Sequence, residues 1–404
     1  MRVKQVSNAL LNLGIKPQEK IAVFSQNCIQ YLYTDFGAYG IRVVSIPFYA
    51  TSSESQIQYM INDAEVKYLF VGEQDQYDKA HRIFPLCPSL ERIIIFDESV
   101  RVSSHDPNAI YFEDFLRLGE GLPRQTEVEK RWAEANEDDV CNILYTSGTT
   151  GASKGVILNY RQYNAAIIAN GKCVGVSDKD RAINFLPFTH VFERGWSYLC
   201  LSVGAQLIIN TYPKEIQDSM RETHPTCMSS VPRFWEKVYQ AVKAKMDEAS
   251  GVQRKLFNHA LRVGRRHNIE YLANGKRPPL ALALEYKLVN NTVLSIVRKQ
   301  LGLEHPNIFP TAGAYVSPEV EQFVHSIGIT MIVGYGLTES LATVSCDRPK
   351  QKYTIGSVGR LIDGIELKIG ENDEILLKGP TITPGYYHRD EANAQSFDKD
   401  GFFH

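Results

Sequence analysis

Apolar residues recur along the chain in two spacings, one typical of amphipathic helices and one typical of buried strands. Residues 3–13 carry apolar side chains at helical spacing and Gly14 follows them, which predicts a helix and its stop. An apolar run at 21–24 and largely apolar stretches at 67–71 and 92–96 predict buried strands that alternate with helical stretches. This alternation favours an α/β fold made of stacked α/β subdomains with largely parallel sheets.

The hydrophobic pattern changes in three later segments. Residues 98–139 are polar with few periodic signals, so we expect a surface connection there. Apolar residues recur at helical spacing from Phe234 to Met246 and again over 280–301, which predicts helices that interrupt the α/β alternation. From about residue 346, glycines punctuate short alternating stretches. We therefore expect α/β subdomains over 1–345, with a helical insertion at about 232–303, and a small β-rich subdomain over 346–404.

Composition agrees with a globular protein that builds a large core. Apolar residues make up 44% of the chain and charged residues 22%, which is close to ordinary averages. The 44 basic and 46 acidic residues give a net charge of -2, so the charge balance gives no reason to expect a nucleic-acid partner. The seven cysteines are scattered without Cys-x-x-Cys spacing, which predicts reduced core residues rather than a disulfide framework or a zinc site.

Membrane signals are weak apart from one basic span. The chain has no run of eighteen apolar residues and no apolar stretch typical of a secretory signal, so we expect a cytoplasmic protein. Between Arg254 and Lys299 there are ten Lys or Arg residues against two acids, Glu270 and Glu285. A solvated helix face explains this excess most simply. The alternative is a peripheral contact of residues 254–299 with an anionic membrane, where each basic residue contributes about 1 kcal/mol.

A candidate phosphate-binding loop lies at residues 145–155, Tyr-Thr-Ser-Gly-Thr-Thr-Gly-Ala-Ser-Lys-Gly. An apolar strand at 140–145 precedes it, and a helix is expected to begin near Asn159 or Tyr160. Backbone N–H groups, hydroxyls and one lysine in such a loop can bind polyphosphate. The Walker spacing fails because Ser153 stands where the second glycine belongs, which disfavours a standard P-loop NTPase. A flexible surface loop is the plainer alternative, and the ordered flanks argue against it.

A second motif, Gly-Tyr-Gly-Leu-Thr-Glu-Ser at 334–340, follows an apolar run at 329–333 that predicts a buried strand. Ligands of open α/β sheets bind at the carboxyl ends of strands, so the two motifs can converge on one crevice. Together they resemble the adenylate-forming superfamily of acyl-CoA synthetases, firefly-type luciferases and peptide-synthetase adenylation domains. Its members have a Ser/Thr/Gly-rich loop ending in Lys-Gly and, much later, a Tyr-Gly-x-Thr-Glu segment.

Two further segments extend this resemblance. Residues 186–194, Leu-Pro-Phe-Thr-His-Val-Phe-Glu-Arg, resemble the histidine-bearing segment near the acyl site, with a strong match to the long-chain fatty acid–CoA ligases. Residues 311–317 stand where the family has a Gly-Gly-Ala turn against adenine, although Ala312 replaces the first glycine. Residues 374–404 resemble the approach to the family's Thr-Gly-Asp motif. We therefore expect the large amino-terminal domain only, without the mobile carboxyl-terminal domain and its catalytic lysine, and a chain that alone makes little acyl-CoA.

The resemblance implies ATP-dependent activation of a fatty acid to an acyl-adenylate, followed by transfer of the acyl group to coenzyme A. The match at 186–194 implies that the fatty acid has a long chain. It implies that Thr338 binds the α-phosphate and that Glu339 holds Mg²⁺ with Thr146 or Thr149. Tyr335 would stack on adenine, Gly313 and Ala314 would line it, and Gly336 would also belong to the nucleotide-binding residues. The β- and γ-phosphates would lie in a loop of Thr146, Ser147, Gly148, Thr149, Thr150, Gly151 and Lys154.

His190 would stand near the acid carboxylate as a gate or orienting group, so the catalytic set implied by the resemblance is Lys154, His190, Thr338 and Glu339. The roles of Arg194 and Trp196 stay open, since each side chain suits either the core or the acyl site. Three other functions also stay open: adenylation of an aryl, amino or short-chain acid, a non-catalytic scaffold, and a membrane-binding module. The sequence predicts neither acyl length nor oligomeric state.

Overall fold

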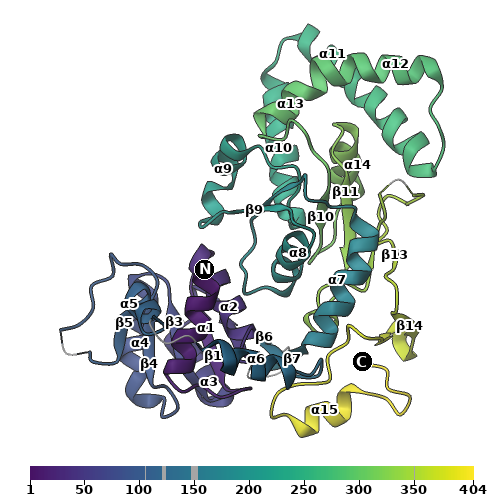
Figure 1. Cartoon of the computed structure of the whole chain (residues 1–404). Helices are drawn as coiled ribbons and strands as arrows, with labels where there is room; N and C mark the ends of the chain where they lie inside the picture. The colour runs from purple at the N-terminus through teal and green to yellow at the C-terminus, as the bar shows by residue number, and fades with distance from the viewer. Residues whose placement is uncertain (105, 121–123, 147–152, 350) are drawn as a thin grey trace. The chain divides into compact units, whose positions relative to one another are not determined.

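The computed structural model describes residues 1–404 except 105, 121–123, 147–152 and 350 (Figure 1). It shows a mixed α/β protein with one large, mostly parallel sheet, which confirms the expected fold class. The chain divides into two compact units. Unit 1 comprises Met1–Asn164, Pro187–Val191 and Leu367–His404, and unit 2 comprises Ala165–Leu186 and Phe192–Glu366.

Unit 1 is built on a seven-stranded sheet in the order β5-β4-β3-β1-β2-β6-β7. Neighbouring strands are parallel except for β6 and β7, which form an antiparallel hairpin. The central strands are buried on both faces, which explains their continuous apolar runs. The strands are β1 (Lys20–Phe24), β2 (Val44–Phe48), β3 (Val66–Val71), β4 (Arg92–Ile95), β5 (Ala109–Tyr111), β6 (Val140–Thr146) and β7 (Lys154–Asn159).

Helices connect the strands of unit 1, as parallel strand pairs require. The segment at 98–139, expected as a surface connection, contains β5 and two short helices, so that expectation is wrong. A helix of six residues, α5, is too short to show clear periodicity, yet Phe112, Phe115 and Leu116 on it are buried. The helices are α1 (Arg2–Asn12), α2 (Ile29–Tyr39), α3 (Glu54–Ala64), α4 (Gln74–Ile83), α5 (Phe112–Arg117) and α6 (Gln125–Ala133).

The carboxyl-terminal part of unit 1 contains a two-stranded sheet of β14 (Glu366–Ile369) and β15 (Ile375–Lys378), followed by α15 (Asp390–Ser396). Helix α7 (Tyr160–Val174) begins in unit 1 and continues into unit 2, and its first residue is one of the two expected from the sequence. The expected division into α/β and β-rich subdomains stays a prediction.

Unit 2 holds a four-stranded sheet in the order β10-β11-β12-β13 and a parallel pair, β8 and β9. Its core includes Trp235, Leu294, Phe309 and Val324, all fully buried. The strands are β8 (Arg181–Asn184), β9 (Gln206–Ile209), β10 (Phe309–Thr311), β11 (Met331–Tyr335), β12 (Ser345–Cys346) and β13 (Arg360–Leu361).

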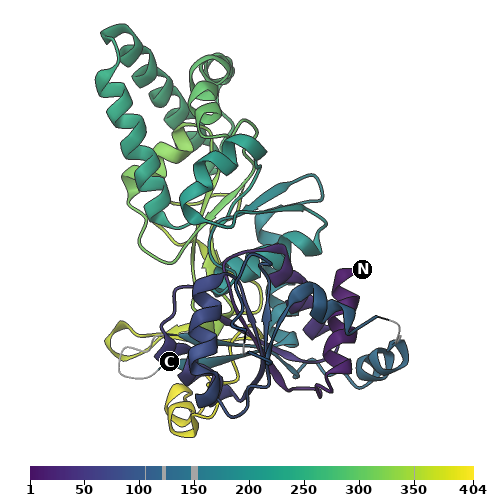
Figure 2. The same ribbon diagram turned by 90° about the vertical axis from the view of Figure 1, so that its left-hand side faces the viewer.

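Residues 232–300 of unit 2 are largely helical, as the spacing of apolar residues predicts, and the long helices gather at one end of this unit (Figures 1 and 2). A π-helical segment, Asn290–Leu294, joins α12 to α13. The helices of unit 2 are α8 (Val191–Ser202), α9 (Ile216–Thr223), α10 (Pro232–Glu248), α11 (Gly251–Arg265), α12 (Leu280–Val289), α13 (Ser295–Gln300) and α14 (Pro318–Ser326). The seven cysteines all lie in the described part of the chain. None of them forms a disulfide and six are buried, which agrees with reduced core residues.

Candidate adenylate-binding site

The β6–β7 hairpin of unit 1 carries the candidate phosphate loop. Thr146 and Lys154 are partners in the strand register, so the two described ends of the loop lie side by side. A strand follows Lys154, and helix α7 begins only at Tyr160, which differs from the strand-to-helix arrangement of a P-loop. Ser147, Gly148, Thr149, Thr150 and Gly151 lie outside the described residues, and their expected role stays a prediction.

A polar network holds the base of this hairpin. The Tyr145 hydroxyl donates a hydrogen bond of 2.6 Å to Asp63 Oδ2, and Arg389 Nη2 donates one of 2.7 Å to Asp63 Oδ1. Tyr59 donates from its hydroxyl to the backbone oxygen of Ser153 at 3.0 Å and accepts a short hydrogen bond from Arg389. Burial and the hydrogen bond to Asp63 raise the pKa of Tyr145, so this phenol stays a donor at neutral pH. The network therefore ties helix α3 and the carboxyl-terminal segment to the loop.

Residues 385–387 also pair with β7 through their backbone. The Ile157 amide donates to the Gly385 carbonyl at 3.0 Å, and the Tyr387 amide donates to the Gly155 carbonyl at 2.8 Å. The Lys154 ammonium lies 5.1 Å from the centre of the Tyr386 ring. A side chain at Gly155 would place its Cβ 2.6 Å from Ile143 Cγ2. The glycine of the Lys-Gly pair is therefore required by packing.

The histidine-bearing segment is anchored on unit 1 by its neighbours. The Phe188 amide donates to Asn27 Oδ1 at 2.9 Å, and the Phe188 ring packs edge-on against Tyr31 at 5.5 Å between centroids. The Thr189 hydroxyl donates to the Phe48 carbonyl at the end of β2, at 3.2 Å. His190 follows directly, just before α8, and its side chain reaches solvent. Desolvation by the atoms around it nevertheless lowers its pKa, which favours the neutral imidazole at neutral pH.

The rest of this segment lies in unit 2 and is buried. Glu193 is fully buried and accepts hydrogen bonds from Ser197 Oγ at 3.0 Å and Ser229 Oγ at 2.6 Å. Burial raises its pKa. Arg194 is also fully buried and donates to the Tyr198 hydroxyl at 2.7 Å. Trp196 is buried too, and its indole N–H has no hydrogen-bond partner among the described residues.

The predicted adenine-binding residues lie at one edge of the unit 2 sheet. Strands β10 and β11 are parallel, with Thr311 opposite Val333, so their carboxyl ends are neighbours. Gly313 and Ala314 follow β10 and are exposed, while Tyr335 ends β11 and is half-buried. Gly313 has a φ of +89°, a conformation that favours glycine. The structure thus brings the two predicted adenine-contacting segments together at this edge.

A tight turn after β11 presents Thr338 and Glu339. The Ala342 amide donates to the Leu337 carbonyl at 3.0 Å and the Val344 amide to the Tyr335 carbonyl at 2.8 Å, which closes the turn. A Cβ on Gly336 would lie 1.8 Å from the Ala342 oxygen, so only glycine fits there. Leu341 and Ala342 have positive φ angles of 49° and 77°, which non-glycine residues rarely adopt. Such strain persists where the surrounding structure holds it, often at functional sites.

The donor set at this turn suits a nucleotide-bound Mg²⁺. Thr338 and Glu339 are both half-buried, and they supply a hydroxyl and a carboxylate, the hard oxygen ligands that Mg²⁺ prefers. Among the described residues no three His, Cys, Asp or Glu side chains are grouped so that they could hold a metal by themselves. Mg²⁺ does not need such a cage, because it keeps several waters and binds one or two carboxylates together with substrate phosphates.

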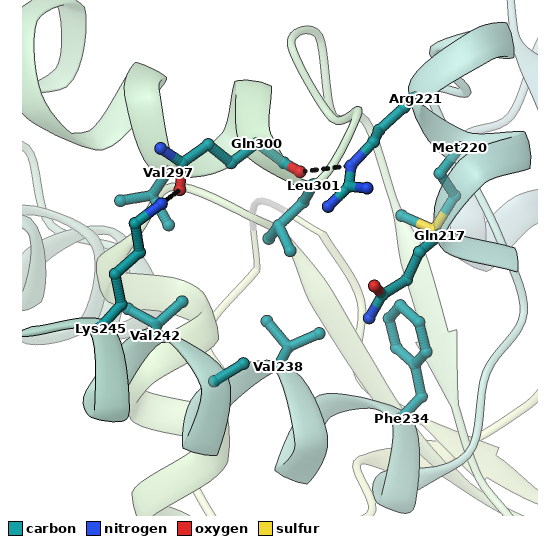
Figure 3. Close-up of a pocket in the computed structure, with 11 residues that line it drawn as sticks. Gln217, Met220, Arg221, Phe234, Val238, Val242, Lys245, Val297, Gln300 and Leu301 are labelled. Atoms are coloured by element: carbon teal, nitrogen blue, oxygen red, sulfur yellow. Dashed lines mark hydrogen bonds between the residues drawn. The ribbon is translucent and has the colours of Figure 1, made fainter.

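A separate groove lies in unit 2 between α9, α10 and α13 (Figure 3). It encloses about 190 Å³ over an apolar floor that includes Phe234 and Val238. At its rim, Lys245 Nζ donates to Gln300 Oε1 at 3.0 Å, and Arg221 Nε donates to the Gln300 carbonyl at 3.1 Å. None of the predicted site residues that the structure describes lines this groove.

Sequence reasoning missed Asp63, Tyr59 and Arg389, which hold the base of the phosphate loop. These residues come from segments up to 330 positions apart, and none belongs to a recognisable motif.

Within the described residues, Thr146 and Lys154 are brought together in unit 1, where His190 also lies. Gly313, Ala314, Tyr335, Gly336, Thr338 and Glu339 are placed in unit 2.

Curated fatty acid–CoA ligases are similar to this chain over nearly its whole length. The chain is 26% identical over 412 residues to long-chain-fatty-acid–CoA ligase ACSBG2 of Xenopus laevis, covering 98% of this chain and 54% of that protein. It is 26% identical to long chain acyl-CoA synthetase 1 of Arabidopsis thaliana, covering 100% of this chain and 62% of that protein. The chain thus spans between about half and three fifths of the length of these relatives.

Solved structures show the same fold. The anthranilate CoA ligase AuaEII in complex with anthranoyl-AMP matches with a TM-score of 0.72 at 18% identity, covering 100% of this chain and 70% of that one. The amino-terminal domain of FACL13 from Mycobacterium tuberculosis matches with a TM-score of 0.68 at 17% identity, covering 100% and 86%. The family model of the AMP-binding enzymes matches residues 1–387. The chain therefore belongs to the AMP-binding enzyme family.

Proposed function

We propose that this chain is the adenylate-forming part of a ligase that joins a long-chain fatty acid to AMP, and that the whole protein transfers the acyl group to coenzyme A. The observation that carries the proposal is the strained turn after β11, which carries Thr338 and Glu339. Strand β11 is the parallel neighbour of β10, and Gly313 follows β10. The long-chain preference is supported by the names of the relatives and by the segment around His190.

In the proposed reaction a carboxylate oxygen of the acid attacks the α-phosphorus of ATP. The bond between that phosphorus and the oxygen bridging to the β-phosphate breaks, and pyrophosphate leaves. The thiol of coenzyme A then attacks the acyl carbon, AMP departs, and the thiol proton is released. Both reactants of the first step are anions, so catalysis consists mainly of positioning and charge neutralisation.

Each residue has a role set by its chemistry. The Thr338 hydroxyl is a donor for an α-phosphate oxygen, and Lys154 supplies a positive charge for the outer phosphates. Glu339 would hold Mg²⁺, with Thr146 or Thr149, and the bound ion would neutralise charge on the phosphate oxygens. The lowered pKa of His190 favours its neutral imidazole at neutral pH. This imidazole can donate or accept one hydrogen bond to orient the acid.

Calorimetric titration with non-hydrolysable acyl-adenylate analogues, from acetyl to long-chain, tests this proposal without requiring turnover. We expect binding that strengthens with acyl length, because each buried methylene contributes about 0.8 kcal/mol. Equal binding at all lengths would favour adenylation of another acid, and an aryl analogue in the same series would identify an aryl acid. Binding at no length would contradict adenylate formation and favour a non-catalytic role.

A further inference from the structure

The outer face of helix α12 is apolar, which is unusual for an exposed helix. Leu280, Leu284 and Leu288 recur every four residues, so they lie on one side of the helix. Their exposed fractions are 77%, 60% and 66%. The exposed face of a helix in a globular protein normally carries polar and charged side chains. We call these three residues the leucine face.

The opposite side of the same helix is held in the core of unit 2. Leu282 and Val289 are buried in that core, as is Leu294 in the π-helical segment that follows. Glu285 on α12 pairs with His259 on α11 at 3.3 Å. These contacts fix the rotation of α12 on its own unit, so the leucine face points away from the core of unit 2.

Basic residues surround the leucine face in the sequence. Lys276 and Arg277 lie in the turn just before α12, Lys287 is exposed next to Leu288, and Arg265 and Arg266 end the neighbouring helix α11. In the described parts of the chain, none of these five side chains forms an ion pair with an acid. The leucine face is therefore combined with uncompensated positive charge.

We propose that the leucine face and the adjoining basic turn bind the surface of an anionic lipid bilayer. Leucine side chains would enter the boundary between headgroups and acyl chains, and Lys276, Arg277 and Lys287 would lie against the negative headgroups. Because the adjoining side chains are positively charged, an anionic membrane complements this surface better than an uncharged apolar partner does. This binding is independent of adenylate formation, because none of the residues involved belongs to the candidate site.

The structure favours a helix that lies on the membrane over one that crosses it. Among the described residues, Leu280–Gln300 alone is long and apolar enough to span a bilayer. It has 21 residues, and an eighteen-residue window within it has a mean hydropathy of 1.2 and is 17% buried. Crossing would withdraw Leu282, Val289 and Leu294 from the core of unit 2. It would also break the 2.6 Å hydrogen bond from Arg298 Nη1 to the Ile327 carbonyl. An amphipathic helix in the plane of the interface keeps these contacts.

Co-sedimentation with lipid vesicles tests the proposal. The chain is mixed with vesicles of phosphatidylcholine alone or of phosphatidylcholine with phosphatidylserine, and the partition coefficient is measured at low and high salt. We expect binding to the anionic vesicles that weakens with salt. Replacing the leucine face by Leu280→Gln, Leu284→Gln and Leu288→Gln should lower the partition coefficient at least about tenfold. Lys276→Gln with Arg277→Gln should lower it about thirtyfold on anionic vesicles only.

Matched controls remove the same groups from other surfaces. Leu86→Gln, Ile168→Gln and Ile369→Gln replace side chains that are 55%, 61% and 58% exposed, and Lys179→Gln with Lys214→Gln removes two exposed charges from unit 2. Both controls should bind vesicles as the unchanged chain does, and all variants should keep its unfolding midpoint. Absence of binding to anionic vesicles, or binding unchanged by the leucine substitutions, would overturn the proposal. So would self-association in sedimentation velocity that these substitutions abolish, because the face would then pack against a second copy.

Discussion

Tyr145 and Asp63, 82 positions apart in the sequence, are joined by a hydrogen bond of 2.6 Å between the phenolic hydroxyl and the carboxylate. The other oxygen of that carboxylate accepts from Arg389, which comes from near the carboxyl terminus. One acid side chain therefore connects α3, the hairpin of the candidate phosphate loop and the segment that pairs with β7. The geometry of the loop ends depends on this connection.

Removing the shared carboxylate should destabilise the base of the loop. For Asp63→Ala we expect the free energy of unfolding to fall by about 2 kcal/mol, because Tyr145 and Arg389 both lose their acceptor. Asp75→Ala, which removes an exposed partner of Lys79 in the same unit, should change it by less than about 0.5 kcal/mol. Urea unfolding of both variants provides the comparison. Equal effects would show that the network contributes no more than a surface ion pair.

Glu339 should be required for adenylation but not for folding. For Glu339→Gln we expect ATP–pyrophosphate exchange to fall by more than about a hundredfold, because the variant loses an anionic ligand for Mg²⁺. The unfolding midpoint should not change, since the side chain lies outside the described cores. Glu222→Gln, an exposed acid of the same unit, serves as the control. Undiminished exchange in Glu339→Gln would refute the metal-binding role.

Gly336 is expected to tolerate no side chain. In Gly336→Ala the new Cβ would lie 1.8 Å from the Ala342 oxygen, so the turn that holds Thr338 and Glu339 must move. We expect binding of an acyl-adenylate analogue to weaken at least about tenfold, a loss of about 1.4 kcal/mol. Gly195→Ala on helix α8 meets no atom within 4 Å and should be neutral or stabilising by up to about 1 kcal/mol. Calorimetry on the two variants separates a local clash from a general intolerance of substitution.

The stability of unit 2 should depend on the ionisation of Asp347. Burial and the neighbouring Glu321 raise its pKa from 3.8 to about 7. The folded state then retains a proton that the unfolded state releases, so this residue lowers stability as the pH rises from about 4 to about 7. For Asp347→Asn we expect a higher free energy of unfolding than for the unchanged chain, with a gain about 3 kcal/mol larger at pH 8 than at pH 5.

Denaturant unfolding at several pH values measures this difference. His325, whose pKa burial lowers to about 4, acts in the opposite sense, since its stabilisation appears as the pH rises from about 4 to 6.5. Comparing the variant with the unchanged chain at each pH cancels the contribution of the histidine. Asp178→Asn, an exposed acid of unit 2, should give the same difference at every pH. A pH-independent difference for Asp347→Asn would mean that this carboxylate is ionised in the folded state throughout.

Several features of the fold were predictable because neighbours in the sequence determine them. The buried strands at 21–24, 67–71 and 92–96 follow from largely apolar stretches, and the helices α10 and α12 follow from apolar residues at helical spacing. Helix α5 was missed, because six residues contain too few turns to show a period. The motifs at 145–155 and 334–340 were recognisable for the same local reason, since each is continuous in the sequence.

Sequence by itself thus determined the α/β class, the family resemblance and the candidate chemistry at two strand ends. Tertiary structure alone decided which distant side chains support that chemistry, such as Asp63 and Arg389 at the base of the phosphate loop. It alone decided that Gly336 meets the Ala342 oxygen and that the leucines of α12 face outward. The spacing of residues along the chain indicates local conformation. Contacts and exposure depend on which distant segments pack against each other, and a local sequence pattern does not contain that information.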